Sequence, residues 1–510
     1  MAVARMPVPA LSLELIRARS LTRVVGLLPL LAILILQGAV SLNLRNTAFQ
    51  DEALYLYAGR QIFDHLLGGP AVLEPYATYF SGLPYAYPVL AGALDQLGGL
   101  ELARLFSLVC MLWATTAVYL LARHFYDRDS AHLAAALFAV QGSVLFLGHL
   151  ATFDALCLAL LGLAAVLSRT AGAARLPFGA LGIGAILFLA VVTKYAGLLF
   201  VPSVLALLFW RTKEAQGWGQ AVLRVILAVA VLIAGTDALI HSNKDIATGL
   251  GFTTTNRHAI VQASRQYLFD RSMTLGGGLV ALAAIGLLLT RGPRRLVAAI
   301  LFGSALLAPA YHIYKGEAVS LPKHVAFGML FAAPLAGHAL ARFTGYGRGE
   351  AVGRRWLAGL AICLLVFGQG INQARQLYNE WPTSNGLAQV LRTQVRPGSG
   401  HILAEEMEVP RYYLQDIVSF WQWSQLYWFD YTDRTGRHLS GTPAYRAAIR
   451  DGYFDLVVLR YGPNADTATA IDDGLRHGKG YDLIAKLPFS TGFGIGDYWV
   501  WRKRNGPAAH

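Results

Sequence analysis

Apolar segments of about 16–22 residues recur along the first three quarters of the chain, and short polar connections separate them. A helix of about 20 apolar residues crosses a hydrocarbon layer of about 30 Å, so these segments are long enough to span a bilayer. The pattern therefore predicts a polytopic bundle of about eleven transmembrane helices. We expect these helices near residues 24–42, 103–121, 131–149, 153–167, 177–192, 195–210, 221–241, 273–290, 296–313, 325–341 and 356–371.

Basic residues are concentrated in every second connection between the expected helices. Because short cytoplasmic loops are enriched in Lys and Arg, this alternation predicts a cytoplasmic N-terminus and an uncleaved first helix in the plasma membrane, the inner membrane of a bacterium. An odd number of helices then places the C-terminal region outside. The residues that set this orientation are Arg5, Arg17, Arg19, Arg23, Arg123, Arg128, Arg169, Arg175, Arg211, Lys213, Arg224, Arg291, Arg294, Arg295, Arg342, Arg348, Arg354 and Arg355.

The polar pattern divides the chain into two domains. Residues 1–372 form the expected transmembrane module, and its first outer loop, 43–102, is long enough to carry structure of its own. Long apolar runs disappear after residue 372, whereas acidic and polar residues increase. Short β-like runs at 401–404, 455–460, 481–488 and 497–502 predict a small extracytoplasmic α/β domain over 373–510. The predicted fold is therefore mainly α, with this α/β domain at its C-terminal end.

Composition supports a membrane protein and excludes other classes. Hydrophobic residues make up 55% of the chain and charged residues 14%, below the roughly 25% of soluble domains. The net charge of +13 arises mainly from short loops, so we expect no nucleic-acid partner. The three cysteines, Cys110, Cys157 and Cys363, fall inside expected helices and have no disulfide or metal-ligand spacing.

Two adjacent carboxylates, Asp51 and Glu52, follow the first expected helix. Acidic groups at a membrane surface cost solvation energy unless they have partners or a function, so this pair is the first candidate for chemistry. Apolar residues after the pair recur at helical spacing, which favours an amphipathic helix along the outer interface. The alternative is that Asp51 only caps this helix, although a capping residue is also a fixed one. The apolar residues of the stripe are Leu54, Ala58, Ile62 and Leu66.

Three further charged positions lie at the outer ends of expected helices. Asp154 begins the fourth helix, and it should face the bundle interior because an acid facing lipid is expensive. Lys194 ends the fifth helix, and Lys323 with His324 begins the tenth. Helix capping or snorkelling to the interface explains each residue singly. Their shared position on one face instead indicates a pocket in which compact lysine charges bind an anionic head group opposite a base.

The order of these motifs resembles the GT-C superfamily of glycosyltransferases. The likeness is to the branch that contains protein O-mannosyltransferases and the bacterial aminoarabinose-to-lipid-A transferases. It covers roughly residues 24–372 in layout. The motifs that carry the resemblance are Asp51-Glu52 followed by Tyr55, Ala58 and Arg60, then Pro84-Tyr85-Ala86-Tyr87-Pro88, Ala103-Arg104-Leu105, Thr193-Lys194-Tyr195-Ala196-Gly197 and Pro322-Lys323-His324.

The resemblance implies a hexosyl- or pentosyltransferase that uses a polyprenyl-phosphate sugar donor on the outer membrane face. Asp51 stands at the position of the family's catalytic base, which takes a proton from the acceptor hydroxyl as it attacks with inversion. The acceptor is an extracytoplasmic glycan, lipid or protein. No cofactor is required, and a divalent metal is not predicted, although some relatives use one. The substrate-binding positions implied by the likeness are Glu52, Tyr55, Arg60, Asp154, Lys194, Tyr195, Lys323 and His324.

The main alternative is a non-catalytic transporter or flippase of lipid-linked sugars. Such a protein should carry polar residues near the bilayer midplane and a repeated topology. Here the polar residues gather at the outer helix ends, and no duplication is visible. The aromatic-rich segment 411–431 is compatible with sugar stacking, but an interface belt or domain packing explains it better.

Overall fold

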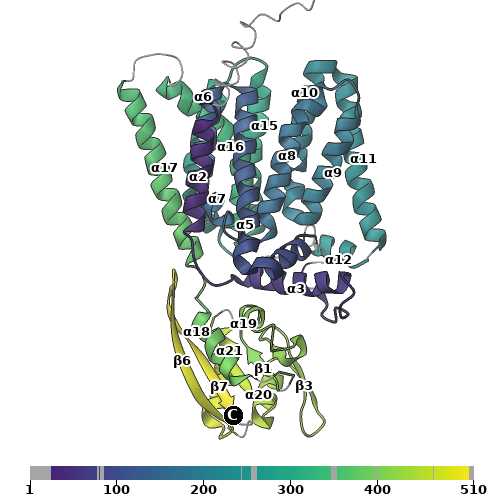
Figure 1. The fold of residues 1–510 in the computed structure, drawn as a ribbon, viewed down its shortest axis with the longest axis vertical. Coiled ribbons are helices and arrows are strands. Elements are labelled where there is room, and N and C mark those ends of the chain that lie inside the picture. Colours follow the sequence, from purple (N-terminus) through teal and green to yellow (C-terminus); the bar gives the residue numbers. More distant parts are fainter. Residues whose placement is uncertain are drawn as a thin grey trace, which may run out of the picture.

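A bundle of membrane-length helices stands on a smaller C-terminal domain in the computed structural model (Figure 1). The structure describes residues 25–76, 80, 86–242, 244–253, 261–345, 353–395, 397–398, 400–462 and 464–504. The N-terminal arginines, Arg348 and the Pro84-Tyr85 part of the second motif lie outside the described residues.

Eight helices of the described residues are long and apolar enough to cross a membrane, and the chain is thus a multi-pass membrane protein. Two further apolar helices, α2 (Leu28–Leu42) and α9 (Phe178–Thr193), are shorter. The predicted helical membrane fold is confirmed, whereas the number of eleven crossings stays a prediction. The eight are α5 (Ala86–Phe125), α8 (Phe153–Ala173), η1 with α10 (Tyr195–Gln216), α11 (Trp218–Ser242), α13 to α14 (Arg265–Leu289), α15 (Arg294–Lys315), α16 (Leu321–Thr344) and α17 (Arg354–Tyr378).

The structure differs from the expected helix limits in two places. The helix expected at 131–149 is divided into α6 (Arg128–Ala139) and α7 (Gly142–Leu147), because Gln141 has an extended backbone. Helix α5 starts earlier than expected, within the first outer loop, and bends at Gly98 and Gly99. Gly99 has a φ of 69°, a conformation that favours glycine.

Helix α16 is the centre of the bundle. Its apolar stretch is 94% buried, against 11% for α11 at the edge, so α11 faces lipid. Small residues allow neighbours to approach α16 closely. An added Cβ at Gly337 would lie 2.4 Å from the carbonyl oxygen of Ser130 in α6. The same helix carries Lys323 in its first turn, so the bundle core fixes the position of that lysine.

Helix α3 (Gln50–Leu66) lies across one end of the bundle, between the bundle and the C-terminal domain (Figure 1). A helix was expected here, and its expected apolar stripe is buried in part: Ala58 is buried, Leu54 and Ile62 are half-buried, and Leu66 is exposed. Beyond the stripe, residues 55–59 are buried without a break. The reason is that α5 covers one side of α3 and α19 (Glu408–Tyr413) of the C-terminal domain covers another. The first half of α3 is therefore enclosed, unlike a helix that rests on a membrane surface.

The C-terminal domain has the predicted α/β composition. Its five-stranded sheet has the order β2-β1-β5-β7-β6, in which β1 pairs in parallel with β2 and β5, while β7 is antiparallel to β5 and β6. The boundary expected at 372 falls inside α17, which continues to Tyr378. The strands are β1 (Ile402–Ala404), β2 (Trp423–Ser424), β5 (Leu456–Leu459), β6 (Tyr481–Thr491) and β7 (Gly494–Lys503), with a separate hairpin of β3 (Asp430–Thr432) and β4 (His438–Ser440). The remaining helices and turns are α12 (Lys244–Thr253), α18 (Asn385–Gln394), η3 (Phe420–Gln422), α20 (Thr442–Asp451) and α21 (Ala465–His477).

Glycine permits the contact between α3 and α5. A Cβ on Gly59 would lie 1.7 Å from the carbonyl oxygen of Pro88, so Gly59→Ala should force the two helices apart. We expect a loss of about 1–3 kcal/mol of stability, measured as a lower apparent unfolding midpoint in detergent. Gly182→Ala is the matched control, because nothing lies within 4 Å of its added Cβ in α9. An equal midpoint for both variants would contradict the close packing of α3 on α5.

Candidate active site

The backbone around Asp51 is fixed by the residue next to it. Phe49 is the N-cap of α3, and its N–H donates to Oε2 of Glu52 at 2.8 Å. Glu52 therefore closes the capping box, and the alternative in which Asp51 only caps the helix is wrong. The Asp51 side chain, in the first turn, is left for another partner.

That partner is Lys323. Its Nζ lies 2.6 Å from Oδ2 of Asp51, although 272 residues separate the two in the chain. A second pair has the same geometry, with Nζ of Lys194 at 2.6 Å from Oδ1 of Asp154. The charges of both pairs also act on one another, so the four groups form one electrostatic cluster.

The four side chains differ in their access to solvent. Asp154 is fully buried, while the side chains of Lys323 and Lys194 are 8% and 12% exposed. Asp51 is the most open, with 33% of its side chain exposed. A group that reacts with an incoming molecule has to be reachable, and Asp51 meets this requirement best.

Helix ends bring the four charges to one end of the bundle. Asp51 and Asp154 lie in the first turns of α3 and α8, where the helix dipole favours an acid. Lys194 is the residue at which α9 ends, in an extended conformation before the 3-10 turn η1. Lys323 follows Pro322 in the first turn of α16. The ion pairs join the start of α3 to the start of α16, and the start of α8 to the end of α9. Helix α3 lies at the end of the bundle that faces the C-terminal domain (Figure 1).

Aromatic rings line the cluster. Tyr55 is buried, and its ring centroid lies 4.2 Å from that of Phe153. Nζ of Lys194 lies 5.3 Å from the centroid of Phe153, and Nζ of Lys323 lies 5.5 Å from that of Phe49. Such contacts stabilise a desolvated ammonium by roughly 0.5–2 kcal/mol. The rings therefore help to keep both lysines charged at this depth.

Two further predicted residues lie beside the cluster. Tyr195 is half-buried at the start of η1, directly after Lys194. His324 follows Lys323, and its Nδ1 lies 2.9 Å from Nε2 of His312 on α15. These positions place both residues near the lysines in the chain.

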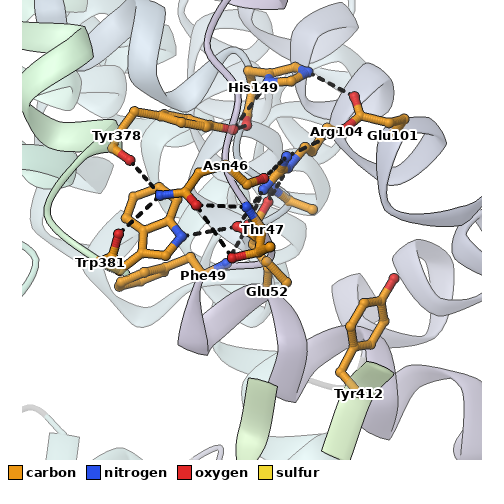
Figure 2. Close-up of polar contacts among 12 residues, drawn as sticks. Asn46, Thr47, Phe49, Glu52, Glu101, Arg104, His149, Tyr378, Trp381 and Tyr412 are labelled. Carbon is orange, nitrogen blue, oxygen red and sulfur yellow. Dashed lines mark hydrogen bonds and ion pairs between the residues drawn. The ribbon is translucent and has the colours of Figure 1, made fainter. Parts of the chain in front are cut away.

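Glu52 differs from the others because all of its contacts are internal. Its side chain is fully buried, and Arg104 of α5 donates to it twice, from Nε at 2.9 Å and from Nη2 at 2.8 Å (Figure 2). Oε1 also accepts the N–H of Ala151 at 2.7 Å. With the bond from Phe49, the carboxylate has four donors. This arrangement holds the start of α3 in place and leaves Glu52 no free face toward a ligand.

Arg104 also ties α3 to other segments. It donates to the backbone oxygens of Asn46 and Thr47, and Trp381 donates to the same oxygen of Thr47 at 3.0 Å. The neighbouring His149 lies between Glu101 and Tyr378 (Figure 2). None of these residues was expected as part of the site. The signal was a lone arginine within an apolar segment, which is expensive unless it is paired.

Arg60 lies outside the charge cluster. Its guanidinium pairs with Asp95 of α5, and Tyr412 of the C-terminal domain donates to the same carboxylate at 2.6 Å. A similar link joins Glu74 to Arg411, with 2.6 Å between Oε1 and Nη1. Both links attach the C-terminal domain to the first outer loop. Of the predicted residues, Asp51, Asp154, Lys194 and Lys323 are therefore brought together with Tyr55, whereas Glu52 and Arg60 serve other contacts.

No group of three or more His, Cys, Asp or Glu side chains in the described part of the chain is arranged to hold a metal ion. The expectation that no cofactor is needed stays a prediction.

The Glu52–Arg104 pair should be essential for the fold. Glu52→Gln leaves a buried guanidinium without its counter-charge, and we expect a loss of about 3–5 kcal/mol. The check is the apparent unfolding midpoint of purified protein in detergent. Glu101→Gln is a matched control on the same arginine. Glu101 is 70% exposed, and its contact with Nη1 of Arg104 is longer, at 3.4 Å, so its charge should contribute little to stability. Similar midpoints for the two variants would show that the buried Glu52–Arg104 pair contributes no more to stability than the exposed Glu101 contact does.

Comparison with known proteins gives both a family match and structural neighbours. Residues 96–238 match the family model of dolichyl-phosphate-mannose-protein mannosyltransferases. No curated protein matches the chain.

Three solved structures of membrane transferases share the fold at low sequence identity. The structure of ArnT from Cupriavidus metallidurans bound to undecaprenyl phosphate is 12% identical, has a TM-score of 0.63, and covers 94% of this chain and 98% of its own. The apo oligosaccharyltransferase of Archaeoglobus fulgidus is 12% identical with a TM-score of 0.52, over 89% and 73% of the two chains. The arabinofuranosyltransferase AftD from Mycobacteria is 15% identical with a TM-score of 0.50, over 93% and 41%. The resemblance drawn from the sequence motifs is thus confirmed at the level of the fold: the chain shares the fold of the ArnT structure over 94% of its length, and residues 96–238 match the mannosyltransferase family model.

Proposed function

We propose that the protein is an inverting glycosyltransferase that moves one monosaccharide from a polyprenyl-phosphate donor to an extracytoplasmic hydroxyl. The observation that carries this proposal is the cluster of two carboxylate–lysine pairs, in which Asp51 is the most exposed member. The fold shared with ArnT, whose structure holds undecaprenyl phosphate, supports a lipid-phosphate donor.

The lysines suit the phosphate of such a donor. In the cluster the two lysines are balanced by the two acids, so no charge is buried alone. A phosphate that enters draws Lys323 away from Asp51, because a lysine is a mobile point charge with three donors. The same movement releases the Asp51 carboxylate to act as a base. Donor binding and activation of the base are then one event.

The reaction needs one proton transfer and one substitution. The acceptor oxygen attacks the anomeric carbon while its proton passes to the carboxylate of Asp51. The bond between that carbon and the phosphate oxygen breaks, and the polyprenyl phosphate leaves with the bonding electrons. Lys194 and Lys323 stabilise the negative charge that grows on the leaving group. Attack opposite the leaving group inverts the anomeric centre.

The other residues have supporting parts in this proposal. Asp154 positions Lys194, because its carboxylate is fully buried and Thr152 donates to it at 3.2 Å. Glu52 positions Asp51 through the helix start. Tyr55 supplies an aromatic wall to the cluster. Tyr195 and His324 contact the donor or the acceptor in this proposal. Arg60 helps to attach the first outer loop to the C-terminal domain, through Asp95.

The basic loops support an orientation in which the N-terminus is cytoplasmic and the cluster faces outside, in a plasma or bacterial inner membrane. A transporter of lipid-linked sugars is less well supported, since its charged residues should lie at the bilayer midplane. The four charges here lie at helix ends, at the starts of α3, α8 and α16 and at the end of α9.

Asp51→Asn should abolish transfer while the protein still folds, because Asp51 is 33% exposed and Asp154 remains as a counter-charge for Lys323. Asparagine retains a hydrogen-bond acceptor for Lys323 but takes up no proton, so the rate should fall by about 10²-fold or more. The assay is release of undecaprenyl phosphate from a panel of undecaprenyl-phosphate sugars in the presence of envelope extract. Asp64→Asn is the matched control, because Asp64 lies on the exposed end of the same helix. Turnover by the Asp51 variant at the control rate would remove Asp51 as the base.

Loss of the Lys194 charge should weaken donor binding more than acceptor binding. Lys194→Met is combined with Asp154→Asn so that no buried carboxylate is left alone. Because a hydrogen bond to a charged group contributes about 1.5–3 kcal/mol, we expect at least about tenfold weaker binding of undecaprenyl phosphate. Thermal stabilisation by added undecaprenyl phosphate measures this, with Lys213→Ala on α10 as a control. Equal losses of affinity for donor and acceptor would contradict the assignment of Lys194 to the phosphate.

A further inference from the structure

A pocket of about 140 Å³ lies between the start of α3, the segment that follows α17, and the inner strands β5 and β7 of the C-terminal sheet. Phe49 and Gln50 form its side toward α3, and they directly precede Asp51 in the chain. The pocket thus opens next to the proposed base, yet none of the four charges of the cluster lines it. It is a separate compartment that shares one wall with the reaction site.

Aromatic rings form the apolar side of this pocket. The centroids of Phe49 and Trp381 are 5.0 Å apart at an angle of 56°. The indole N–H of Trp381 donates to Thr47, so the ring is held in one orientation. Tyr498 of β7 adds a third ring, whose hydroxyl lies 3.2 Å from Oγ of Ser384. These rings give the pocket a rigid apolar wall.

Carboxylates form the polar side. Among the pocket's lining residues are three glutamates and a single cationic group, Arg460. Glu406 lies 2.5 Å from Nη2 of Arg460, and Glu380 is paired with Arg271 at 2.9 Å. Glu405 is buried and accepts three backbone N–H groups of residues 460–462, which fixes the loop that carries Arg460. The cations at this pocket are therefore already paired with acids.

A second observation indicates an unmet polar contact nearby. Glu408 is 94% buried, and its Oε2 has no hydrogen-bond partner among the described residues. Its carboxylate accepts from Gln50, a lining residue, and lies within electrostatic reach of Asp51. A buried acceptor without a donor costs about 1–3 kcal/mol. Glu408 does not itself line the pocket, so it acts on a ligand there only through its bond with Gln50.

Resting on the proposed glycosyltransferase function, we infer that this pocket is the acceptor subsite and that it binds an uncharged saccharide rather than a phosphate- or carboxylate-bearing acceptor. Aromatic faces cover the C–H faces of a sugar ring, and carboxylates with an arginine bond its hydroxyls. An anionic group here would meet glutamates whose cationic partners are already occupied. A hydroxyl of the bound saccharide would then be presented at the start of α3, beside Asp51.

The state of Glu406 fits a hydroxyl ligand. Burial raises the pKa of Glu406 to about 7, and Glu408 and Glu405 act in the same direction against Arg460. Near neutral pH this group is present both as a carboxylate, which only accepts hydrogen bonds, and as an acid, which also donates. Sugar hydroxyls donate and accept in the same way.

The experiment uses saturation-transfer NMR on the full chain in detergent, with mannobiose, maltose and lactose as neutral probes and glucuronic acid and mannose 6-phosphate as anionic ones. We expect at least one neutral disaccharide to bind and neither anionic sugar to bind as strongly. Glu406→Lys should lower the affinity for the neutral sugar by about tenfold or more and admit glucuronic acid, as the charge reversal of one wall requires. Glu406→Gln, which keeps the size of the side chain, should relax only the discrimination against glucuronic acid. Asp473→Lys is the control, an exposed acid-to-lysine change on α21. It should alter neither the affinity for the neutral sugar nor the discrimination against glucuronic acid.

Stabilisation by undecaprenyl phosphate is measured on the same samples, and it should be unchanged in both Glu406 variants. If this stabilisation is present but no neutral disaccharide binds, or anionic sugars bind the wild type equally well, the subsite is overturned while the proposed function stands. If Glu406→Lys binds all probes as the wild type does, the subsite is overturned as well. If undecaprenyl phosphate fails to stabilise the wild type, the proposed function is the part that fails.

Discussion

The cost of burying charge at the end of a membrane bundle determines the architecture of this protein. An isolated ion removed from water loses several kcal/mol, and only a well-placed counter-ion with further hydrogen bonds restores it. Glu52 and Arg104 meet this condition with two mutual bonds and additional backbone contacts. Because Glu52 also accepts the N–H of Phe49, the N-cap residue of α3, electrostatics and helix initiation fix the same backbone atoms. The backbone of the neighbouring Asp51 is held in place in the same way, although its side chain takes no part in the Glu52–Arg104 pair.

The same constraint explains why the charges of the cluster occur in pairs. Two acids and two lysines satisfy each other across four helix ends, so the cluster is neutral as a whole. In the proposed mechanism a phosphate competes with the carboxylates for the lysines and leaves Asp51 with a weaker partner, so donor binding and release of the base are linked.

Local sequence patterns predicted the parts of the structure that depend on local physics. The apolar segments predicted the membrane helices, and the charged helix ends predicted that Asp51, Asp154, Lys194 and Lys323 share one face. The sequence did not show which acid pairs with which lysine. Lys323 lies 272 residues from Asp51, and the residues around each of them do not encode the pairing. For the same reason Glu52 was expected to contact substrate, although its partner Arg104 buries it completely. A lone arginine in an apolar segment was the available signal.

The contacts between the C-terminal domain and α3 bear on how the two proposed compartments work together. Tyr412 and Arg411 of α19 hold the first outer loop through Asp95 and Glu74, and Trp381 bonds the backbone just before α3. Helix α3, which carries Asp51, is therefore held on the bundle side by the ion pair with Arg104 and packs against α19 on the side of the C-terminal domain. A domain attached this rigidly does more than cover the site, because it sets the distance between the aromatic pocket and the base. An acceptor seated against Glu406 and Trp381 reaches Asp51 only if that distance is constant, and the buried polar links are what keep it constant.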